Sequence, residues 1–262
     1  MKTHRLRRGG IMAALAAATV LVSAAPAYAE PGDGSAYGAK VDVQLLGQDA
    51  VQAGPFAAAS TEGPTQNSFA GVNLPGVLKT GVINTEAVRD DESGAVTAKA
   101  STTDVEITLL KAALKEAGVK LVEAVCTATQ EGVKGSTQLV GANLGKLGDV
   151  SSTPAANTEL AVKLPGVGNI ATVILNEQIK NKDGSLTVNA VHVKLLGDGL
   201  VGAIGSGDVV VSSATCGPAA PPIPMASGAG LWIGLGLVAA VGLPAGVYVI
   251  RRRRGATTEA AA

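Results

Sequence analysis

Aromatic residues are scarce in this chain, making up 2% of its 262 residues. Between Glu30 and Met225 they are limited to Tyr37, Phe56 and Phe69. Sugar-binding surfaces and protein-binding hot spots commonly rely on aromatic side chains. The chain therefore has little material from which to build either kind of platform.

Histidine is equally scarce, with His4 near the start and His192 as the one histidine between residues 30 and 225. Nucleophilic catalysis needs a base beside Ser, Cys or Thr, and the sequence contains no G-x-S-x-G, H-E-x-x-H, P-loop or dinucleotide-binding motif. His192 alternates with Val191 and Val193, so we interpret it as a solvent-side or hydrogen-bonded surface histidine. We therefore predict no enzyme activity, no cofactor and no metal ligands.

Arginine is almost missing from the same region, where Arg89 stands alone. Residues 30–225 contain 13 Lys and Arg against 20 Asp and Glu, a net charge of −7. Nucleic-acid binding depends on cations that contact phosphates. The sequence therefore predicts no nucleic-acid partner and a poor fit to anionic lipid surfaces.

The first 29 residues have the pattern of a secretory signal peptide. A basic segment, residues 2–8, precedes the apolar residues 11–22, and the small-residue site Ala27-Tyr28-Ala29 follows. The apolar run is shorter than the roughly 20 residues that a membrane-spanning helix needs. We therefore expect the mature chain to begin at Glu30.

Residues 226–250 carry no charge and are long enough to span a bilayer. Trp232 and Tyr248 lie near the two ends of this segment, where interfacial aromatic residues are found. A cluster that stays on the cytoplasmic side follows it: Arg251, Arg252, Arg253 and Arg254. We expect a single-pass anchor in the cell membrane, with residues 30–217 outside the cell and residues 251–262 inside it.

Two further features belong to this anchor. The proline-rich residues 218–225 predict a stiff, extended stalk between the domain and the bilayer. Gly230 and Gly234 have the spacing that lets two membrane helices approach closely, which predicts self-association. Ordinary use of glycine in a membrane helix is the alternative interpretation.

Cysteine occurs twice, as Cys126 and Cys216, both in the region expected outside the cell. An even number of cysteines in an exported chain favours pairing. Two thiols are too few for a structural zinc site. We predict a disulfide between them.

Alternation of apolar and polar residues predicts a mainly β, sandwich-like domain. Val41, Val43 and Leu45 show the pattern most clearly. The other predicted strands are residues 81–88, 95–100, 120–129, 158–164, 169–180, 191–195 and 208–214. One short helix is predicted at residues 108–117, with Gly118 as its end.

An internal match appears at an offset of 90 residues. Val72–Val77 and Val162–Val167 share the block L-P-G-V, and Cys126 falls on Cys216. The match predicts two duplicated β-rich halves, residues 72–126 and 162–216. Chance matching in a chain rich in Gly, Ala and Val is the alternative.

The densest acidic cluster is Asp90, Asp91 and Glu92, in an expected hairpin turn. Carboxylate oxygens bind calcium, but this spacing is not that of a known calcium loop. We favour a solvated turn and keep calcium binding as the alternative.

Three segments resemble the choice-of-anchor P family of actinobacterial surface proteins: Leu175–Gln178, Gly184–Val193 and Gly207–Ala214. The resemblance extends from about Ser35 to Cys216. Val122–Cys126 and Cys216 are also similar to a group of Streptomyces surface proteins anchored by an LAETG signal, which this chain lacks. The resemblance implies a role at the cell surface and brings no activity or catalytic residue.

These observations favour a membrane-anchored surface protein that acts as a structural or interaction module without catalytic activity. Its partner would be a component of the cell envelope or another protein. Two alternatives stay open: an envelope-polymer hydrolase that uses two carboxylates, and a module that binds calcium or another ligand.

Overall fold

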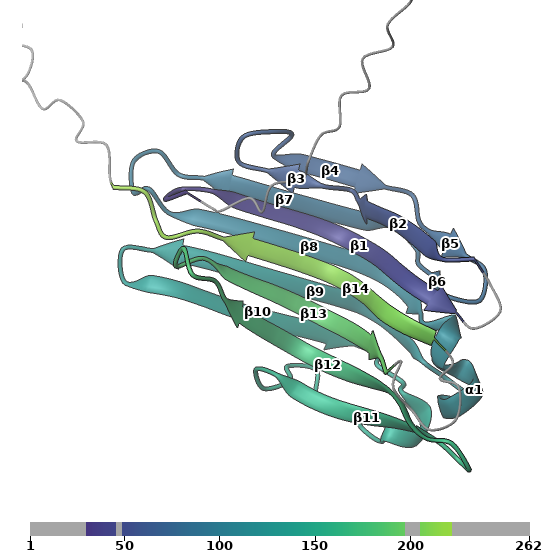
Figure 1. The fold of residues 1–262 in the computed structure, drawn as a ribbon. Coiled ribbons are helices and arrows are strands. Elements are labelled where there is room, and N and C mark those ends of the chain that lie inside the picture. The colour runs from purple at the N-terminus through teal and green to yellow at the C-terminus, as the bar shows by residue number, and fades with distance from the viewer. Residues whose placement is uncertain (1–29, 46–48, 197–204, 222–262) are drawn as a thin grey trace, which may run out of the picture.

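The computed structural model describes residues 30–45, 49–196 and 205–221, which form two antiparallel β-sheets and one short α-helix (Figure 1). The predicted signal peptide, the predicted anchor at 226–250 and the tail at 251–262 lie outside these residues. Within the described ranges, no helix has the length and apolar character needed to cross a membrane. The prediction of a mainly β domain with one short helix is confirmed.

The front sheet in Figure 1 has the strand order β11-β12-β13-β14-β1-β2, with β3 paired to β1. Its strands are β1 (Gly34–Leu45), β2 (Val51–Phe56), β3 (Ala59–Ser60), β11 (Thr158–Leu164), β12 (Gly168–Lys180), β13 (Leu186–Leu195) and β14 (Gly205–Cys216). The first strand of the domain therefore lies beside the last one.

The back sheet has the strand order β10-β9-β8-β6-β5, with β7 paired to β8 and β4 paired to β7. Its strands are β4 (Gln66–Phe69), β5 (Asn73–Leu74), β6 (Leu78–Lys79), β7 (Ile83–Arg89), β8 (Val96–Glu106), β9 (Gly118–Thr129) and β10 (Gly132–Val140). All pairings in both sheets are antiparallel.

The core lies between the two sheets, where small apolar side chains meet. On the front sheet Val41, Val193 and Val209 are at most 1% exposed, and on the back sheet Ala98 and Val122 are fully buried. On β1 and β8 the buried positions alternate with exposed or half-buried residues, as a half-buried strand requires, whereas β13 and β14 contain runs of consecutive buried residues. The apolar faces of the two sheets thus form one shared core.

The predicted disulfide is present and joins the two sheets. Cys126 on β9 and Cys216 on β14 are bonded, with their Cα atoms 5.6 Å apart. Both residues are fully buried. The covalent link therefore runs through the core from one sheet to the other.

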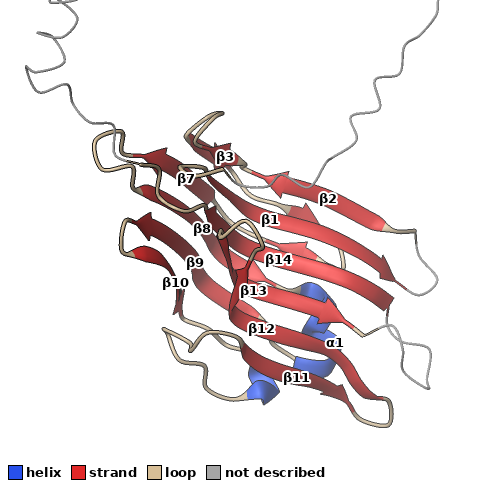
Figure 2. Ribbon diagram, turned by 60° about the vertical axis from the view of Figure 1, so that its left-hand side comes forward, coloured by secondary structure: helices blue, strands red, loops and turns tan. Residues whose placement is uncertain are grey.

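The predicted helix at 108–117 is shorter than expected and lies at one end of the sheets (Figure 2). A 3₁₀ turn, η1 (Thr108–Leu110), leads into α1 (Lys111–Leu114), and a second 3₁₀ turn, η2 (Gly145–Leu147), was not predicted. Lys115 has a φ of +67° and ends α1, so the prediction that Gly118 ends it is wrong. The predicted apolar face is buried nonetheless: Leu110, Ala113, Leu114 and Ala117 are at most 2% exposed.

The two L-P-G-V blocks form the same turn. The amide of Val77 donates to the carbonyl of Leu74 at 3.0 Å, and the amide of Val167 donates to Leu164 at 3.0 Å. The central glycines, Gly76 and Gly166, have φ values of +76° and +79°, a conformation that glycine adopts without strain. Each turn precedes a set of three antiparallel strands, β7-β8-β9 in one half and β12-β13-β14 in the other.

The residues after β14 bind back to the domain. We name Gly217–Ala220 the strap. The amide of Gly217 donates to Asp33 at 2.7 Å, the amide of Gly32 donates to Pro218 at 2.8 Å, and the amide of Ala220 donates to Gly94 at 2.9 Å. The strap therefore belongs to the folded domain, and the predicted start of the stalk at residue 218 comes before the end of that domain.

Candidate functional site

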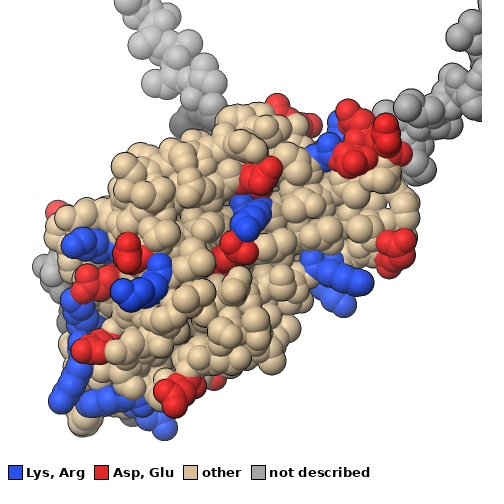
Figure 3. Space-filling model, turned by 180° about the vertical axis from the view of Figure 1, so that it is seen from behind, with Lys and Arg blue, Asp and Glu red and all other residues tan. Residues whose placement is uncertain are grey.

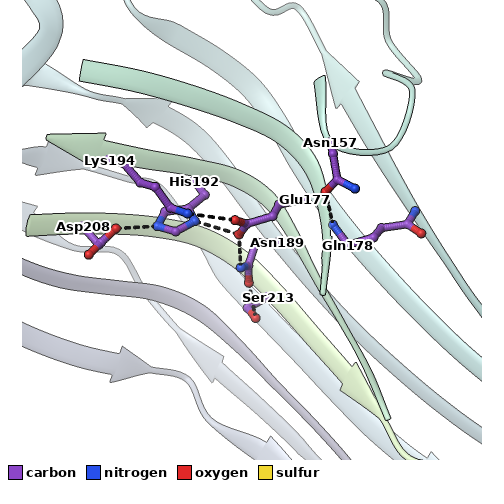
Figure 4. Close-up of polar contacts among 8 residues, drawn as sticks. All are labelled: Asn157, Glu177, Gln178, Asn189, His192, Lys194, Asp208 and Ser213. Carbon is purple, nitrogen blue, oxygen red and sulfur yellow. Dashed lines mark hydrogen bonds and ion pairs between the residues drawn. The ribbon is translucent and has the colours of Figure 1, made fainter. Parts of the chain in front are cut away.

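The front sheet changes its alternation of inward and outward side chains at two residues with positive φ, Asn176 on β12 (+50°) and Ser212 on β14 (+55°). Ser212 follows the buried Val211, yet it also faces the core, because its Oγ donates to the carbonyl of Val122 on the back sheet at 2.8 Å. Beyond these two positions, Glu177 and Ser213 lie on the side of the sheet away from the core (Figure 4).

A buried carboxylate, Glu177, is the centre of a polar network on that outer side (Figure 4). Its Oε2 accepts a hydrogen bond from Asn189 Nδ2 at 2.7 Å and lies 2.7 Å from His192 Nδ1. Its Oε1 lies 3.3 Å from Lys194 Nζ. On the other side of the ring, His192 Nε2 lies 2.8 Å from Asp208 Oδ1.

Further hydrogen bonds fix the surroundings of this carboxylate. Ser213 Oγ donates to Asn189 Oδ1 at 2.7 Å, which orients the Asn189 amide toward Glu177. Next to Glu177 on β12, the amide of Gln178 donates to Asn157 Oδ1 at 2.8 Å (Figure 4). We call the following set the Glu177 network: Glu177, Asn189, His192, Lys194, Asp208 and Ser213.

The geometry of the Glu177 network defines the protonation of His192. Ionised carboxylates accept hydrogen bonds and cannot donate them, so a ring held between Glu177 and Asp208 donates from both nitrogens and is positively charged. Burial alone would lower the pKa of His192, but the hydrogen bonds to Glu177 and Asp208 outweigh it and raise the pKa. Both carboxylates therefore favour the protonated, imidazolium form of His192.

The same contacts act in the opposite direction on Glu177, whose side chain is 9% exposed. Burial alone would raise its pKa. The hydrogen bonds from His192 and Asn189, together with the charges of His192 and Lys194, outweigh that effect and lower the pKa to about 2. Two anions, Glu177 and Asp208, thus balance two cations, His192 and Lys194.

This arrangement restricts the chemistry that the network can perform. Both ring nitrogens of His192 are hydrogen-bonded to carboxylates, so neither is free to accept a proton from a substrate, and His192 is not placed as a general base. Glycoside hydrolysis by two carboxylates needs one of them protonated near neutral pH, with a raised pKa. Glu177 has a lowered pKa, and the imidazole ring fills the space between it and Asp208.

His192 is hydrogen-bonded, as one alternative interpretation stated. It lies on the outer side of the sheet beside a surface cavity, and it is 8% exposed because its carboxylate partners surround it. Sequence reasoning missed Glu177 and Asp208 as its partners. The irregular residue Asn176 shifts Glu177 to the outer side, and a regular alternation does not reveal such a shift.

A shallow surface cavity of about 410 Å³ lies beside the network. His192, Lys194 and Asp208 contribute to its wall, and Lys40 and Asp42 of β1 lie opposite them. Cations and anions both line the cavity, so it offers no strong field of one sign to a ligand. Tyr37 also lines it, and burial raises the pKa of that phenol.

In the acidic turn, a carboxylate oxygen of Asp90 accepts hydrogen bonds from groups of the turn itself. Asp90 Oδ1 accepts hydrogen bonds from the amide of Glu92 at 3.0 Å, the amide of Ser93 at 2.8 Å and the hydroxyl of Ser93 at 3.0 Å. The bonds from Ser93 lower the pKa of Asp90. No group of three or more His, Cys, Asp or Glu residues in the described part of the chain is arranged to hold a metal ion. These contacts favour the solvated-turn interpretation over calcium binding.

The predicted anchor residues Trp232, Tyr248 and Arg251–Arg254 lie outside the described residues, as do Gly230 and Gly234. Their roles stay predictions. No protein-family model, no curated protein and no solved structure matches this chain. The resemblance to the choice-of-anchor P family therefore also stays a prediction.

Proposed function

We propose that this chain is a non-enzymatic interaction module, displayed on the outer face of the cell membrane and held there by residues 226–250. The observation that carries the proposal is the state of His192, whose two ring nitrogens are both occupied by carboxylates. A surface hydrolase needs a base, a nucleophile or a metal-bound water. His192 is the chain's best candidate for that base, and both of its ring nitrogens are held by the carboxylates of the Glu177 network.

Other groups support the same conclusion. The two thiols are joined in a disulfide and are unable to act as nucleophiles. Glu177 has a pKa of about 2, too low for a general acid near neutral pH. The described chain instead offers the outer faces of two seven-stranded sheets as surfaces for a partner.

The two ends of the domain lie together, which decides how a C-terminal anchor would orient the domain. The bond between Gly32 and Pro218 places them side by side, so a C-terminal anchor and the mature N-terminus would lie at the same end. The rest of the domain would extend away from the membrane. This placement suits a module that presents its sheets to the surroundings.

Cell fractionation tests the location. We expect the full chain in the membrane fraction, with its lysines labelled on intact cells by a membrane-impermeant reagent. Deletion of residues 226–262 should release the domain into the medium. A full chain found in the cytosol, or protected from the reagent on intact cells, would contradict the proposal.

Activity assays test the absence of catalysis. The purified full chain should not turn over peptidoglycan, arabinogalactan, or generic ester and peptide substrates. Glu177→Gln and Asp208→Asn serve as matched variants, because each removes one carboxylate of the network. Turnover that disappears in either variant would overturn the non-enzymatic proposal in favour of a carboxylate hydrolase.

We also propose that the two β-rich halves, residues 72–126 and 162–216, arose by duplication. The shared L-P-G-V turn and the paired positions of Cys126 and Cys216 support it. Sequences of relatives test it, because the 90-residue offset should strengthen when each half is compared as a profile. An offset that varies at random among relatives would contradict duplication.

A further inference from the structure

The strand β11 (Thr158–Leu164) ends the front sheet and, among the described residues, pairs only with β12. It lies at the lower edge of the molecule in Figure 1. Alternate residues of an edge strand turn their amide and carbonyl groups away from the neighbouring strand. Apart from the pairing with β12, no hydrogen bond in the described ranges involves residues 159–163. The edge therefore offers unpaired backbone groups to a further strand.

The other sheet edges have features that hinder such pairing. On β2, Pro55 has no amide hydrogen to donate. On β10, the amide of Leu139 already donates to the carbonyl of Ser152 at 2.7 Å. The strands β3 and β5 have two residues each, and β4 has four. β11 has seven residues and no proline, so of these edges it is the one best suited to accept another strand.

The charges on β11 are placed symmetrically about its middle residue, Ala161. When two copies of the strand pair antiparallel over their full length, Ala161 lies opposite its own equivalent. Glu159 then lies opposite Lys163 of the second copy, and Lys163 lies opposite Glu159 of the second copy. All three residues are exposed on the outer face of the strand. Opposite charges directly across an antiparallel pair attract, so one contact forms two Glu–Lys pairs.

The full-length register is also the one that matches the charges. If the symmetry axis moved to Leu160, Glu159 would lie opposite Ala161, and if it moved to Val162, Lys163 would lie opposite Ala161. Neither shift places a cation opposite an anion. Within the described ranges, Glu159 and Lys163 have no ion-pair partner in their own chain, so the contact between copies breaks no existing pair.

The inner face of β11 contributes apolar surface to the same contact. Leu160 and Leu164 face the core but are only half-buried there. In the full-length register Leu160 lies opposite Val162 of the second copy, and opposite residues share one face of a sheet. Each copy would therefore cover part of the other's exposed leucine surface, which favours association.

We propose that two copies of this chain associate through β11, in antiparallel register centred on Ala161. The contact joins two front sheets into one continuous sheet across a two-fold axis. The inference rests on the proposed function of an interaction module and names the partner as a second copy. Figure 3 shows the molecule from behind, with cations and anions mixed along its lower end, so no patch of one sign repels the second copy there.

The antiparallel register also decides how the two copies are oriented. From its pairing with Thr158, β12 continues to Lys180, which pairs with Leu186. Leu186 in turn pairs with Cys216, the residue before the strap. β11 therefore begins toward the end of the domain that holds the strap, and an antiparallel contact places the two straps at opposite ends. Copies held by residues 226–250 would thus pair between two facing membranes.

The strength of the contact follows from its size. Seven residues of one strand bury a small area, so the pairing is weak in dilute solution. Many copies on two facing surfaces gain strength by avidity. The test therefore has to trap a weak complex or present many copies at once.

Cysteine cross-linking of the purified full chain tests the register. The two native cysteines are bonded to each other, so Ala161→Cys introduces the one free thiol. Opposite residues of an antiparallel pair have Cα atoms about 4.5–5.5 Å apart, within the range of a disulfide. We expect oxidised Ala161→Cys to run as a covalent dimer on a non-reducing gel. Glu159→Cys is the matched control, because its equivalent in the second copy lies about 14 Å away, and it should stay monomeric.

Charge reversal in the Ala161→Cys background tests the Glu–Lys pairs. Lys163→Glu places a carboxylate opposite Glu159 and should slow formation of the covalent dimer about tenfold, because two attractive pairs become repulsive. Adding Glu159→Lys exchanges the two charges, restores opposite pairs and should restore the rate. Unchanged thermal unfolding of these exposed variants would show that the fold is intact.

Vesicles that carry the full chain test the orientation. We expect light scattering to show that they cluster, that Lys163→Glu prevents clustering, and that the exchanged pair restores it. The inference is wrong if Ala161→Cys gives no covalent dimer, if Glu159→Cys gives as much, or if exchanging the charges does not restore the rate. Covalent dimers without clustering would refute the facing-membrane arrangement. Substrate turnover or a cytosolic location would instead refute the proposed function and leave the β11 contact intact.

Discussion

At the scale of single residues, Glu177 and His192 show how a buried ion pair is stabilised. Each charge would be costly alone in its position, where the side chains are 9% and 10% exposed. Asn189, Lys194 and Asp208 supply the contacts that keep both charged. Removing one partner would leave the charge of the other buried and unpaired, which strongly destabilises the fold.

We therefore expect Glu177→Gln to destabilise the fold by about 3 kcal/mol at pH 7, because it leaves His192 and Lys194 without their shared anion. Chemical denaturation measures this free energy of unfolding. A depressed pKa contributes stability that is present above about pH 4.5 and is lost as the pH falls toward 2, so the cost should shrink in acid.

The exposed Glu159 on β11 provides the control. Glu159→Gln should change the free energy of unfolding by less than about 0.5 kcal/mol. Equal effects of the two substitutions at pH 7 would show that the network adds nothing to stability.

His192 should make stability depend on pH in the opposite range. Its pKa is raised in the folded state, so its contribution is complete below about pH 6.5 and is lost as the pH rises through the raised value. We expect a lower free energy of unfolding at pH 9 than at pH 6. His192→Gln should remove most of this difference, and a variant that keeps the full pH dependence would refute the assignment.

At the scale of elements, the alternation of residues predicted the long strands well but missed β10. Its inward positions include Gly135 and Thr137, which have no large apolar side chain, so the sequence shows no alternation there. Gly135 lies opposite Val188, and a Cβ atom at Gly135 would come 2.4 Å from Val188 Cγ2. The position of β10 depends on how it packs against β13, and a local sequence pattern does not contain this contact.

A close approach between β1 and β7 gives a test of sheet packing. A Cβ atom at Gly38 would come 1.9 Å from Ile83 Cγ2, and Ile83 is fully buried. Gly38→Ala should therefore cost about 1–3 kcal/mol through overpacking. Ile83→Ala alone should cost about 2–5 kcal/mol through its cavity.

A double variant tests whether Gly38 and Ile83 are in contact. If the two residues touch, Gly38→Ala with Ile83→Ala should cost less than the sum of the single changes, because the new methyl group fills part of the cavity. Thermal or chemical denaturation of the four proteins gives the coupling energy. Strict additivity would mean that the sheets do not meet at this point.

At the scale of the whole molecule, the disulfide is the part of the structure that sequence reasoning foresaw most directly. Two cysteines in a chain that is expected to be exported leave one pairing, and the structure contains it. The Glu177 network could not be predicted by the same kind of reasoning, because its members come from β12, β13 and β14. Strand register, and not spacing along the chain, brings them together.

Loss of the disulfide should lower the free energy of unfolding. Cys126→Ala with Cys216→Ala opens a loop with a sequence separation of 90 residues. The chain-entropy model gives a loss of roughly 4 kcal/mol for a loop of this length. Urea denaturation of the oxidised protein, the reduced protein and the double variant measures it. The reduced protein and the variant should agree, and an oxidised protein of equal stability would contradict the prediction.

The position of Cys216 also decides how the domain would carry a mechanical load. The strap begins at the next residue, Gly217, so tension applied from the C-terminal side that breaks the hydrogen bonds of the strap then reaches Cys216. The disulfide passes that tension directly to β9, in the back sheet. The chain between Cys126 and Cys216 is bypassed and cannot be drawn out while the bond is intact.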